Sequence, residues 1–184
     1  TATNSAGVGE IPTEGSVKID GANLGSALAG SIQATKISAN TTAGFSIVTH
    51  TGTGSAGTVD HGLGAKPSFI ITKGLSDGYN WFVYNQVSGA TKALILSNSG
   101  ADTAYSTVFN NTEPDTSLIT FGTATATNGS GINYVSYVIS EIAGYSKIGV
   151  YAGGGSGGEF VYLGFRPAWV MIKSTSASTQ WLIF

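Results

Sequence analysis

The sequence predicts an all-β protein, an antiparallel β-sandwich of jelly-roll or lectin-like type. Only 10% of the residues are charged while 41% are hydrophobic, so the chain carries enough apolar side chains to form a core. It also contains 27 glycines, and each glycine in a helix interior costs about 1 kcal/mol relative to alanine. Short runs of β-branched and aromatic residues recur between glycine- and serine-rich turns, as they do in sandwiches and barrels.

The first thirty residues are predicted to be an arm or linker, with a short strand over 16–20 and one helical turn within 21–30. Strands then follow one another at short intervals. They are predicted over 31–37, 45–51, 68–73, 81–85, 92–97, 106–109, 118–123 and 133–142. The last of these carries apolar side chains on both faces, so we expect it to be buried on both sides.

A unit of forty residues occurs twice in the chain. Residues 45–84 align with residues 145–184 without a gap, at an offset of one hundred residues. Nine positions are identical, and they include residue types that rarely coincide by chance. The most telling identities are Leu63/Leu163, Gly64/Gly164, Pro67/Pro167, Lys73/Lys173 and Trp81/Trp181. The duplication therefore predicts two copies of one strand-turn-strand unit.

Each unit reverses direction at a short segment that ends in proline. In the first unit this segment is 63–67, and it follows a glycine-rich loop. Proline fixes φ and cannot donate to a β-ladder, so it is well placed at the start of the next strand. We expect 63–67 and 163–167 to form equivalent turns. The structural turn residues are then Gly64, Pro67, Gly164 and Pro167.

The duplication also predicts the domain organisation. It consists of an arm at 1–30, a β domain over 31–144 that contains the first unit, and the second unit at 145–184. The second unit has no counterpart of 85–144, so we expect it to be truncated. Its last strand would then require a partner strand from missing residues or from another chain.

Composition argues against several classes of function. The net charge is only −2 and the charges form no basic patch, which disfavours a nucleic-acid partner. No run of about 18 apolar residues is present, so we expect no membrane span. Cysteine is absent, which excludes disulfides, cysteine-ligated zinc and thiol catalysis. We expect no cofactor.

The histidines are the first candidates for chemistry. His50 and His61 are the only two, and the second unit has valine at both equivalent positions. A zinc site needs three or four ligands, and no cysteine or acidic cluster accompanies the pair. We therefore predict no metal site. The adjacent Asp60 and His61 suggest a catalytic triad, but no nucleophile-elbow motif is present.

Two other features are weaker candidates. The glycine-rich segment 152–158 lacks the Lys-Ser/Thr pair and the helix that a phosphate-binding loop needs. Glu141 is a carboxylate in a largely apolar strand, and we interpret it as an edge or interface residue. A glycosidase would need a pair of carboxylates facing each other across a cleft. We therefore expect a protein that is not an enzyme, and a glycan depolymerase is the least favoured alternative.

Aromatic residues are the better functional lead. Tyrosine and tryptophan beside short polar side chains suit a sugar-stacking surface or a subunit interface, although each ring can equally belong to the core. The candidate binding residues are Tyr79, Trp81, Tyr105, Tyr151, Tyr162 and Trp181.

Several motifs together resemble a known type of domain. They are GFSIVTHTG, HGLGAKP, NYVSY, EIAGYSKIG and FVYLGFRPAWVMIK, and as a set they resemble an uncharacterised repeat domain of bacteriophage tail-fibre and appendage virion proteins. The resemblance covers roughly residues 43–184. Upstream, GEIPTEGSVKIDGANLGSAL is similar to a short segment near the start of phage tail appendage proteins. No catalytic residues come with the resemblance.

The resemblance implies a virion or extracellular location and a structural or host-attachment role. Its implied partners are copies of the chain itself, with a homotrimer as the default for a fibre, and other virion proteins. The expected function is a non-enzymatic structural or adhesin module that assembles through β-sheet surfaces. The alternative is a lectin-like domain that binds a host surface glycan.

Overall fold

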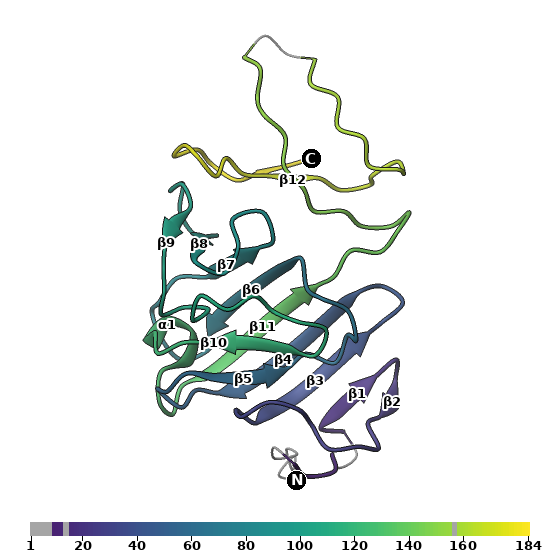
Figure 1. Ribbon diagram of the computed structural model, residues 1–184, viewed down its shortest axis with the longest axis vertical. Coiled ribbons are helices and arrows are strands. Elements are labelled where there is room, and N and C mark those ends of the chain that lie inside the picture. Colours follow the sequence, from purple (N-terminus) through teal and green to yellow (C-terminus); the bar gives the residue numbers. More distant parts are fainter. Residues whose placement is uncertain (1–8, 13–14, 156–157) are drawn as a thin grey trace.

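The computed structural model in Figure 1 describes residues 9–12, 15–155 and 158–184, and it confirms the all-β class. Within these residues the single helix is the short α1 (Thr125–Asn128). The strands are β1 (Val17–Ile19), β2 (Ala22–Asn23), β3 (Ala34–Asn40), β4 (Phe45–Thr51), β5 (Gly57–Asp60), β6 (Phe69–Gly74), β7 (Phe82–Asn85), β8 (Lys92–Ile95), β9 (Thr103–Ala104), β10 (Leu118–Phe121), β11 (Asn133–Ile139), β12 (Met171–Ile172) and β13 (Leu182–Ile183).

One large sheet dominates the described part of the chain. Its strand order is β2-β1-β3-β4-β11-β6-β7-β8-β9, and β1 runs parallel to β3 while the other neighbours run antiparallel. β5 and β10 form a small sheet that lies in front of the large one in Figure 1. β12 and β13 form a separate hairpin, which lies beyond β7 and β8 on the side away from the β5–β10 pair in Figure 1. The two layers of the sandwich are therefore unequal.

The main core lies between the large sheet and the β5–β10 pair. The large sheet contributes Val48, Ile70 and Val138, which are fully buried. Val59 of β5 and Phe121 of β10 face them from the smaller sheet and are equally buried. Alternation along each strand directs one set of side chains into this core and the other set toward the opposite face of the large sheet.

β11 occupies the centre of the large sheet, between β4 and β6. From Tyr134 to Ile139 it is buried or half-buried on both faces, as its apolar pattern predicted. It pairs with β4 over seven residues, so it joins segments more than eighty residues apart. Both faces carry apolar side chains because Val138 belongs to the main core while Ile139 packs against the cluster on the outer face.

The N-terminal segment differs from the prediction. A strand is present there as β1, but the helical turn expected within 21–30 is absent from the structure. Asp20 and Gly21 have φ values of +51° and +81°, and this left-handed pair turns the chain into the β1–β2 hairpin. Leu28 is 4% exposed and belongs to the core, so residues 16–30 pack on the β domain. Residues 1–8 lie outside the described part.

Two further elements were assigned wrongly from the sequence. No strand was predicted at 57–60, where β5 forms because β10 pairs with all four residues. Residues 106–109 were expected as a strand but form a turn, in which Val108 and Phe109 are each 1% exposed. Their apolar side chains indicate burial in the core, and they do not require extended backbone.

Candidate assembly surface

The two copies of the repeated unit form the same hairpin. In the first hairpin, β6–β7, the facing pairs are Ile71–Val83 and Thr72–Phe82. In the second hairpin, β12–β13, they are Met171–Ile183 and Ile172–Leu182. Each pair in the second hairpin is the pair in the first shifted by one hundred residues. Both units therefore have the same register, although only the first hairpin belongs to the large sheet.

The predicted turn residues occupy corresponding bends. Gly64 has a φ of +65° and Gly164 a φ of +84°, a region in which glycine is unstrained. Pro67 comes two residues before β6 begins at Phe69. Pro167 comes four residues before β12 begins at Met171. Their surroundings differ, because Pro67 is buried whereas Pro167 is exposed.

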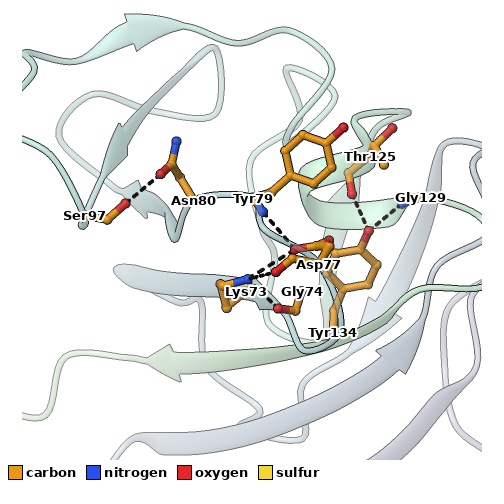
Figure 2. Close-up of polar contacts among 9 residues, drawn as sticks. All are labelled: Lys73, Gly74, Asp77, Tyr79, Asn80, Ser97, Thr125, Gly129 and Tyr134. Carbon is orange, nitrogen blue, oxygen red and sulfur yellow. Dashed lines mark hydrogen bonds and ion pairs between the residues drawn. The ribbon is translucent and has the colours of Figure 1, made fainter.

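The repeated lysine donates to backbone carbonyls in both units, and in the first unit it also closes the hairpin loop. Figure 2 shows Lys73 Nζ donating to Gly74 O at 2.5 Å and to Asp77 Oδ1 at 3.1 Å. The Lys73–Asp77 ion pair is largely buried, with 16% and 11% of the two side chains exposed. In the second unit, Lys173 Nζ donates to Ser174 O at 2.8 Å and to Ser99 O at 3.2 Å. The lysine thus satisfies backbone carbonyls in both units.

Other polar groups near the first lysine are paired, although Asp77 Oδ2 is buried without a hydrogen-bond partner. The Tyr134 hydroxyl accepts from Gly129 N at 2.8 Å and donates to Thr125 O. On the other side of the loop, Ser97 donates to the Asn80 side chain at 2.9 Å. These hydrogen bonds hold α1 and the loop after β8 against the end of the large sheet where β6 ends and β11 begins.

The two units differ sharply in burial. Val83 and Tyr84 are fully buried, whereas the equivalent Ile183 and Phe184 are 63% and 72% exposed. Among the described residues, ten of the sixteen exposed large hydrophobic side chains lie in the second unit. They are Tyr145, Val150, Tyr151, Phe160, Val161, Tyr162, Trp169, Leu182, Ile183 and Phe184. We call this set the second-unit apolar surface.

The second hairpin is attached to the outer face of the large sheet, which is the face that carries Phe69, Val83 and Leu94. Met171 and Trp181 pack against these three residues. Trp181 Nε1 also donates to Ile95 O at 3.1 Å. The side chains at positions 171 and 183 lie on one face of the hairpin and those at 172 and 182 on the other. The face with Leu182 points away from the first unit's cluster.

The rest of the outer face contains an open hollow near β1, β3 and β4. Its volume is about 390 Å³, and its lining includes Asp20, Ser38, Asn40, Phe45 and Ile47. Phe45 and Ile47 are each 37% exposed. The Asp20 carboxylate accepts hydrogen bonds from Thr41 N and Thr41 Oγ1 at 2.7 and 2.6 Å, which lower the pKa of Asp20. Asp20 therefore stays ionised at the rim.

The six candidate aromatic residues do not form one platform. Tyr79, Tyr151 and Tyr162 are 50%, 46% and 75% exposed. The other three are half-buried and have structural contacts. Trp81 stacks on Tyr137 with ring centroids 6.5 Å apart, Tyr105 meets the Phe82 ring edge-on, and Trp181 anchors the second hairpin.

Both histidines are buried between the two layers. His50 lies between the rings of Phe121 and Tyr134, at centroid distances of 4.8 and 5.1 Å. Its Nε2 donates to Thr127 O, and burial lowers the pKa of His50 to about 4. His61 Nε2 donates to Asp115 O, and burial also lowers the pKa of His61. Both rings are therefore neutral at neutral pH. His50 contacts both layers, whereas His61 bonds to the turn before β10 in the smaller sheet.

The acidic candidates are spread over the molecule. Glu141 Oε1 accepts from Ile148 N at 2.7 Å and from Gln86 Nε2 at 3.1 Å, so it fixes the start of the second unit to the end of β7. Asp60 accepts from Ala29 N and Gly62 N. The described residues contain no group of three or more His, Cys, Asp or Glu side chains able to hold a metal ion.

Sequence reasoning did not single out Glu113. Its carboxylate accepts from the Tyr84 hydroxyl at 2.6 Å and from Ala90 N at 2.7 Å, and it forms an ion pair with Lys66 at 3.4 Å. These interactions outweigh partial burial and lower the pKa of Glu113. Its position in a Glu-Pro-Asp turn gave no sign of a buried tyrosine partner more than twenty residues away.

These features define a class of protein: an all-β module with a duplicated hairpin, in which the second copy presents core-type side chains at the surface. The chain belongs to the family described as a domain of unknown function (DUF7483), whose model matches residues 18–184. No curated protein and no solved structure matches the chain. Among the described residues, no helix is long and apolar enough to cross a membrane.

Proposed function

We propose that the chain is a non-enzymatic structural module that assembles with copies of itself, as part of a virion appendage. The second-unit apolar surface is the observation that carries this proposal. Ten exposed large hydrophobic side chains within forty residues are more than the scattered few of an ordinary monomer surface, and exposed apolar surface of this kind marks interaction sites. Tyrosine, tryptophan and phenylalanine, which are abundant in this set, are enriched at the centres of protein interfaces.

The virion setting is supported by the motifs that resemble phage tail-fibre and appendage proteins. A chain with few charges and no cysteine also needs another source of stability if it works outside a cell, and association between subunits supplies one. The partners are then copies of the chain and neighbouring virion proteins. A homotrimer is the expected assembly, as in fibres.

Analytical ultracentrifugation over a range of protein concentrations tests the assembly. We expect the wild type to form an oligomer and Leu182→Asp to shift it toward monomer, because a buried unpaired charge opposes association. Gln180→Asp adds the same charge at an exposed polar position two residues away and is the matched control. A wild type that stays monomeric at the highest soluble concentration would overturn the proposal.

Glycan binding is the second candidate, and the hollow on the outer face favours it. Small-molecule sites combine apolar walls with a few well-placed polar groups, and here Phe45 and Ile47 lie beside Asp20 and Asn40. A glycan array would test binding. We expect Phe45→Ala to abolish any signal and Tyr79→Ala, an exposed ring outside the hollow, to leave it unchanged. An array without hits would contradict this function.

A further inference from the structure

The second hairpin differs from the first in its free edges. In the large sheet, β6 lies between β11 and β7, and β7 lies between β6 and β8. In the described part of the chain, β12 and β13 pair only with each other. Figure 1 shows the second hairpin standing apart from the strands of the large sheet. An unpaired strand edge is a template for another strand.

The hydrogen bonds identify the groups at this edge. Val170 and Phe184 exchange two backbone hydrogen bonds, at 3.0 and 2.9 Å. Because such pairs alternate along an antiparallel ladder, the N–H and C=O of Met171 point to the opposite side, away from β13. In the first unit the equivalent Ile71 faces Tyr137 of β11. In the first unit, the edge of β6 that corresponds to the free edge of β12 is therefore covered by β11.

The exposed face of the second hairpin corresponds to the buried face of the first. Leu182 and Phe184 occupy the positions of Phe82 and Tyr84. Phe82 and Tyr84 are 8% and 0% exposed, whereas Leu182 and Phe184 are 50% and 72% exposed. The second hairpin therefore exposes side chains that have the chemistry of a core.

We propose that β12 accepts an antiparallel strand with the pattern of β11, donated by another polypeptide. This inference deepens the proposed assembly function, on which it rests, by naming the edge and the chemistry of the partner. The partner strand alternates apolar residues on both faces, as Asn133–Ile139 does. Main-chain hydrogen bonds supply affinity in this mode of recognition, and side-chain pockets supply specificity.

One position distinguishes the partner from β11 itself. In the first unit, Thr72 Oγ1 and Ser136 Oγ are hydrogen-bonded at 2.9 Å inside the sheet. The second unit has Ile172 in place of Thr72 and cannot form this bond. A serine facing Ile172 would have no hydroxyl opposite it, whereas an apolar side chain there would form an apolar cross-strand pair with Ile172. The preferred partner therefore has an apolar residue at the position of Ser136.

Binding can be measured by fluorescence anisotropy with a labelled synthetic peptide that copies residues 131–142. The full chain is titrated into this peptide and into a version with Ser136→Val. We expect saturable binding of both peptides, with the valine version bound about threefold more tightly, which corresponds to about 0.7 kcal/mol. No binding of either peptide, or tighter binding of the serine version, would overturn the inference.

Methylated peptides test the direction of the hydrogen bonds. Leu75 N donates to Asn133 O at 2.7 Å and Gly52 N donates to Ile132 O at 2.8 Å, so odd-numbered residues of β11 bond to β6 and even-numbered residues to β4. A peptide N-methylated at Tyr137 should therefore lose binding to β12, while one N-methylated at Val138 keeps it. Equal binding of the two peptides would contradict the proposed edge.

Variants of the chain locate the peptide. Ile172→Asp, which places a charge opposite position 136 of the peptide, should weaken peptide binding by about tenfold, while Phe160→Asp, at a residue 86% exposed outside the hairpin, leaves it unchanged. Hydrogen exchange should show peptide-dependent protection at 170–173. Protection at 69–74 instead would mean that the peptide displaces β11, and would overturn the inference.

The same samples separate this inference from the proposed function. A monomeric chain that binds the peptide with the expected methylation pattern would support the β12 edge and overturn self-assembly. An oligomeric chain that ignores the peptide would support self-assembly and overturn the β12 edge.

Discussion

The two hairpins of the repeat share a register and differ in nearly everything around it. In the first unit β6 spans Phe69–Gly74, while in the second β12 spans only Met171–Ile172. Both have the glycine bend, the proline and a lysine that donates to backbone carbonyls. Local sequence thus specifies the turn and the pairing, whereas the length and burial of a strand depend on its neighbours.

The first segment of each unit also shows that a strand depends on its neighbours. β4 is a seven-residue strand because β3 and β11 pair with it on both sides. The equivalent residues 145–151 form no strand, although Ser146 and Ile148 match Ser46 and Val48 in type. A strand needs hydrogen-bonded neighbours and a covered face to be stable in water. Here residues 145–151 have no paired strand beside them, and the second unit's own sheet consists of β12 and β13 alone.

The equivalent residues Tyr84 and Phe184 offer the largest contrast in stability. Tyr84→Ala should lower the free energy of unfolding by about 3–5 kcal/mol, because a fully buried ring is lost and Glu113 loses its hydroxyl donor. Phe184→Ala should change it by less than about 0.5 kcal/mol, since the ring is 72% exposed. Urea unfolding at low protein concentration measures both.

Tyr84→Phe, which copies the residue of the second unit, separates the ring from its hydroxyl. This variant should cost about 1 kcal/mol, the usual net value of one hydrogen bond. Similar losses for Tyr84→Ala and Phe184→Ala would show that the second hairpin is as well packed as the first, contrary to the structure.

His50 is valine in the second unit, and the substitution His50→Val should alter the pH dependence of stability. The pKa of His50 falls from 6.5 to about 4 on burial, so the unfolded chain binds more protons between these pH values. Stability should therefore fall as the pH is lowered through this window, by about 3 kcal/mol from this group. His61, whose pKa burial also lowers, acts in the same direction.

The measurement is the free energy of urea unfolding at pH 7, 6, 5 and 4 (a range set by the ordinary histidine pKa). The His50→Val variant should retain only the smaller slope due to His61 and the carboxylates. A variant with the wild-type slope would show that His50 is already exposed to solvent, or charged, in the folded protein.

The repeated lysines should contribute unequally. Lys73→Met leaves the largely buried Asp77 carboxylate without its ion-pair partner and should cost about 2 kcal/mol. Lys173→Met should cost less than about 1 kcal/mol, because Lys173 contacts only backbone carbonyls among the bonds described. Thermal unfolding compares the two.

A double variant supplies the control for the first lysine. Lys73→Met with Asp77→Ala removes both charges and places at position 77 the alanine that the second unit has at 177. It should recover most of the stability lost in Lys73→Met alone. No recovery would mean that Lys73 acts through the Gly74 carbonyl rather than through Asp77.

Much of the fold could be predicted from patterns that are local in the sequence. The all-β class followed from composition, and the strands at 45–51 and 81–85 lie within a residue of β4 and β7. β5 could not be predicted, because the segment begins with glycine and becomes a strand only through its pairing with β10. The helical turn near Leu24 and Leu28 was wrong because Asp20 and Gly21 turn the chain into a hairpin first.

The candidate site was harder to predict, because exposure depends on long-range packing. Residue type indicated that Trp81 and Trp181 were important, but not that one stacks on Tyr137 while the other donates to Ile95. The hollow at Phe45 and Asp20 depends on the pairing of β1 with β3, and no sequence motif predicts this pairing. Only the comparison of the two units, position by position, identified the second-unit apolar surface.

The attachment of the second hairpin should show the smallest effect. Trp181→Phe keeps a ring against Phe69, Val83 and Leu94 but removes the hydrogen bond to Ile95 O, worth about 1 kcal/mol. The detached state of the hairpin should then be populated about fivefold more. Amide exchange at 170–173 and 181–184 should accelerate by that factor, while exchange in β4 and β11 stays unchanged, because these strands belong to the first unit's core.

Trp81→Phe, at the equivalent position, should leave exchange of the second hairpin as it is. Faster exchange throughout the chain in Trp181→Phe would mean that the two units unfold together, and would remove the distinction between a stable first hairpin and a separately attached second one.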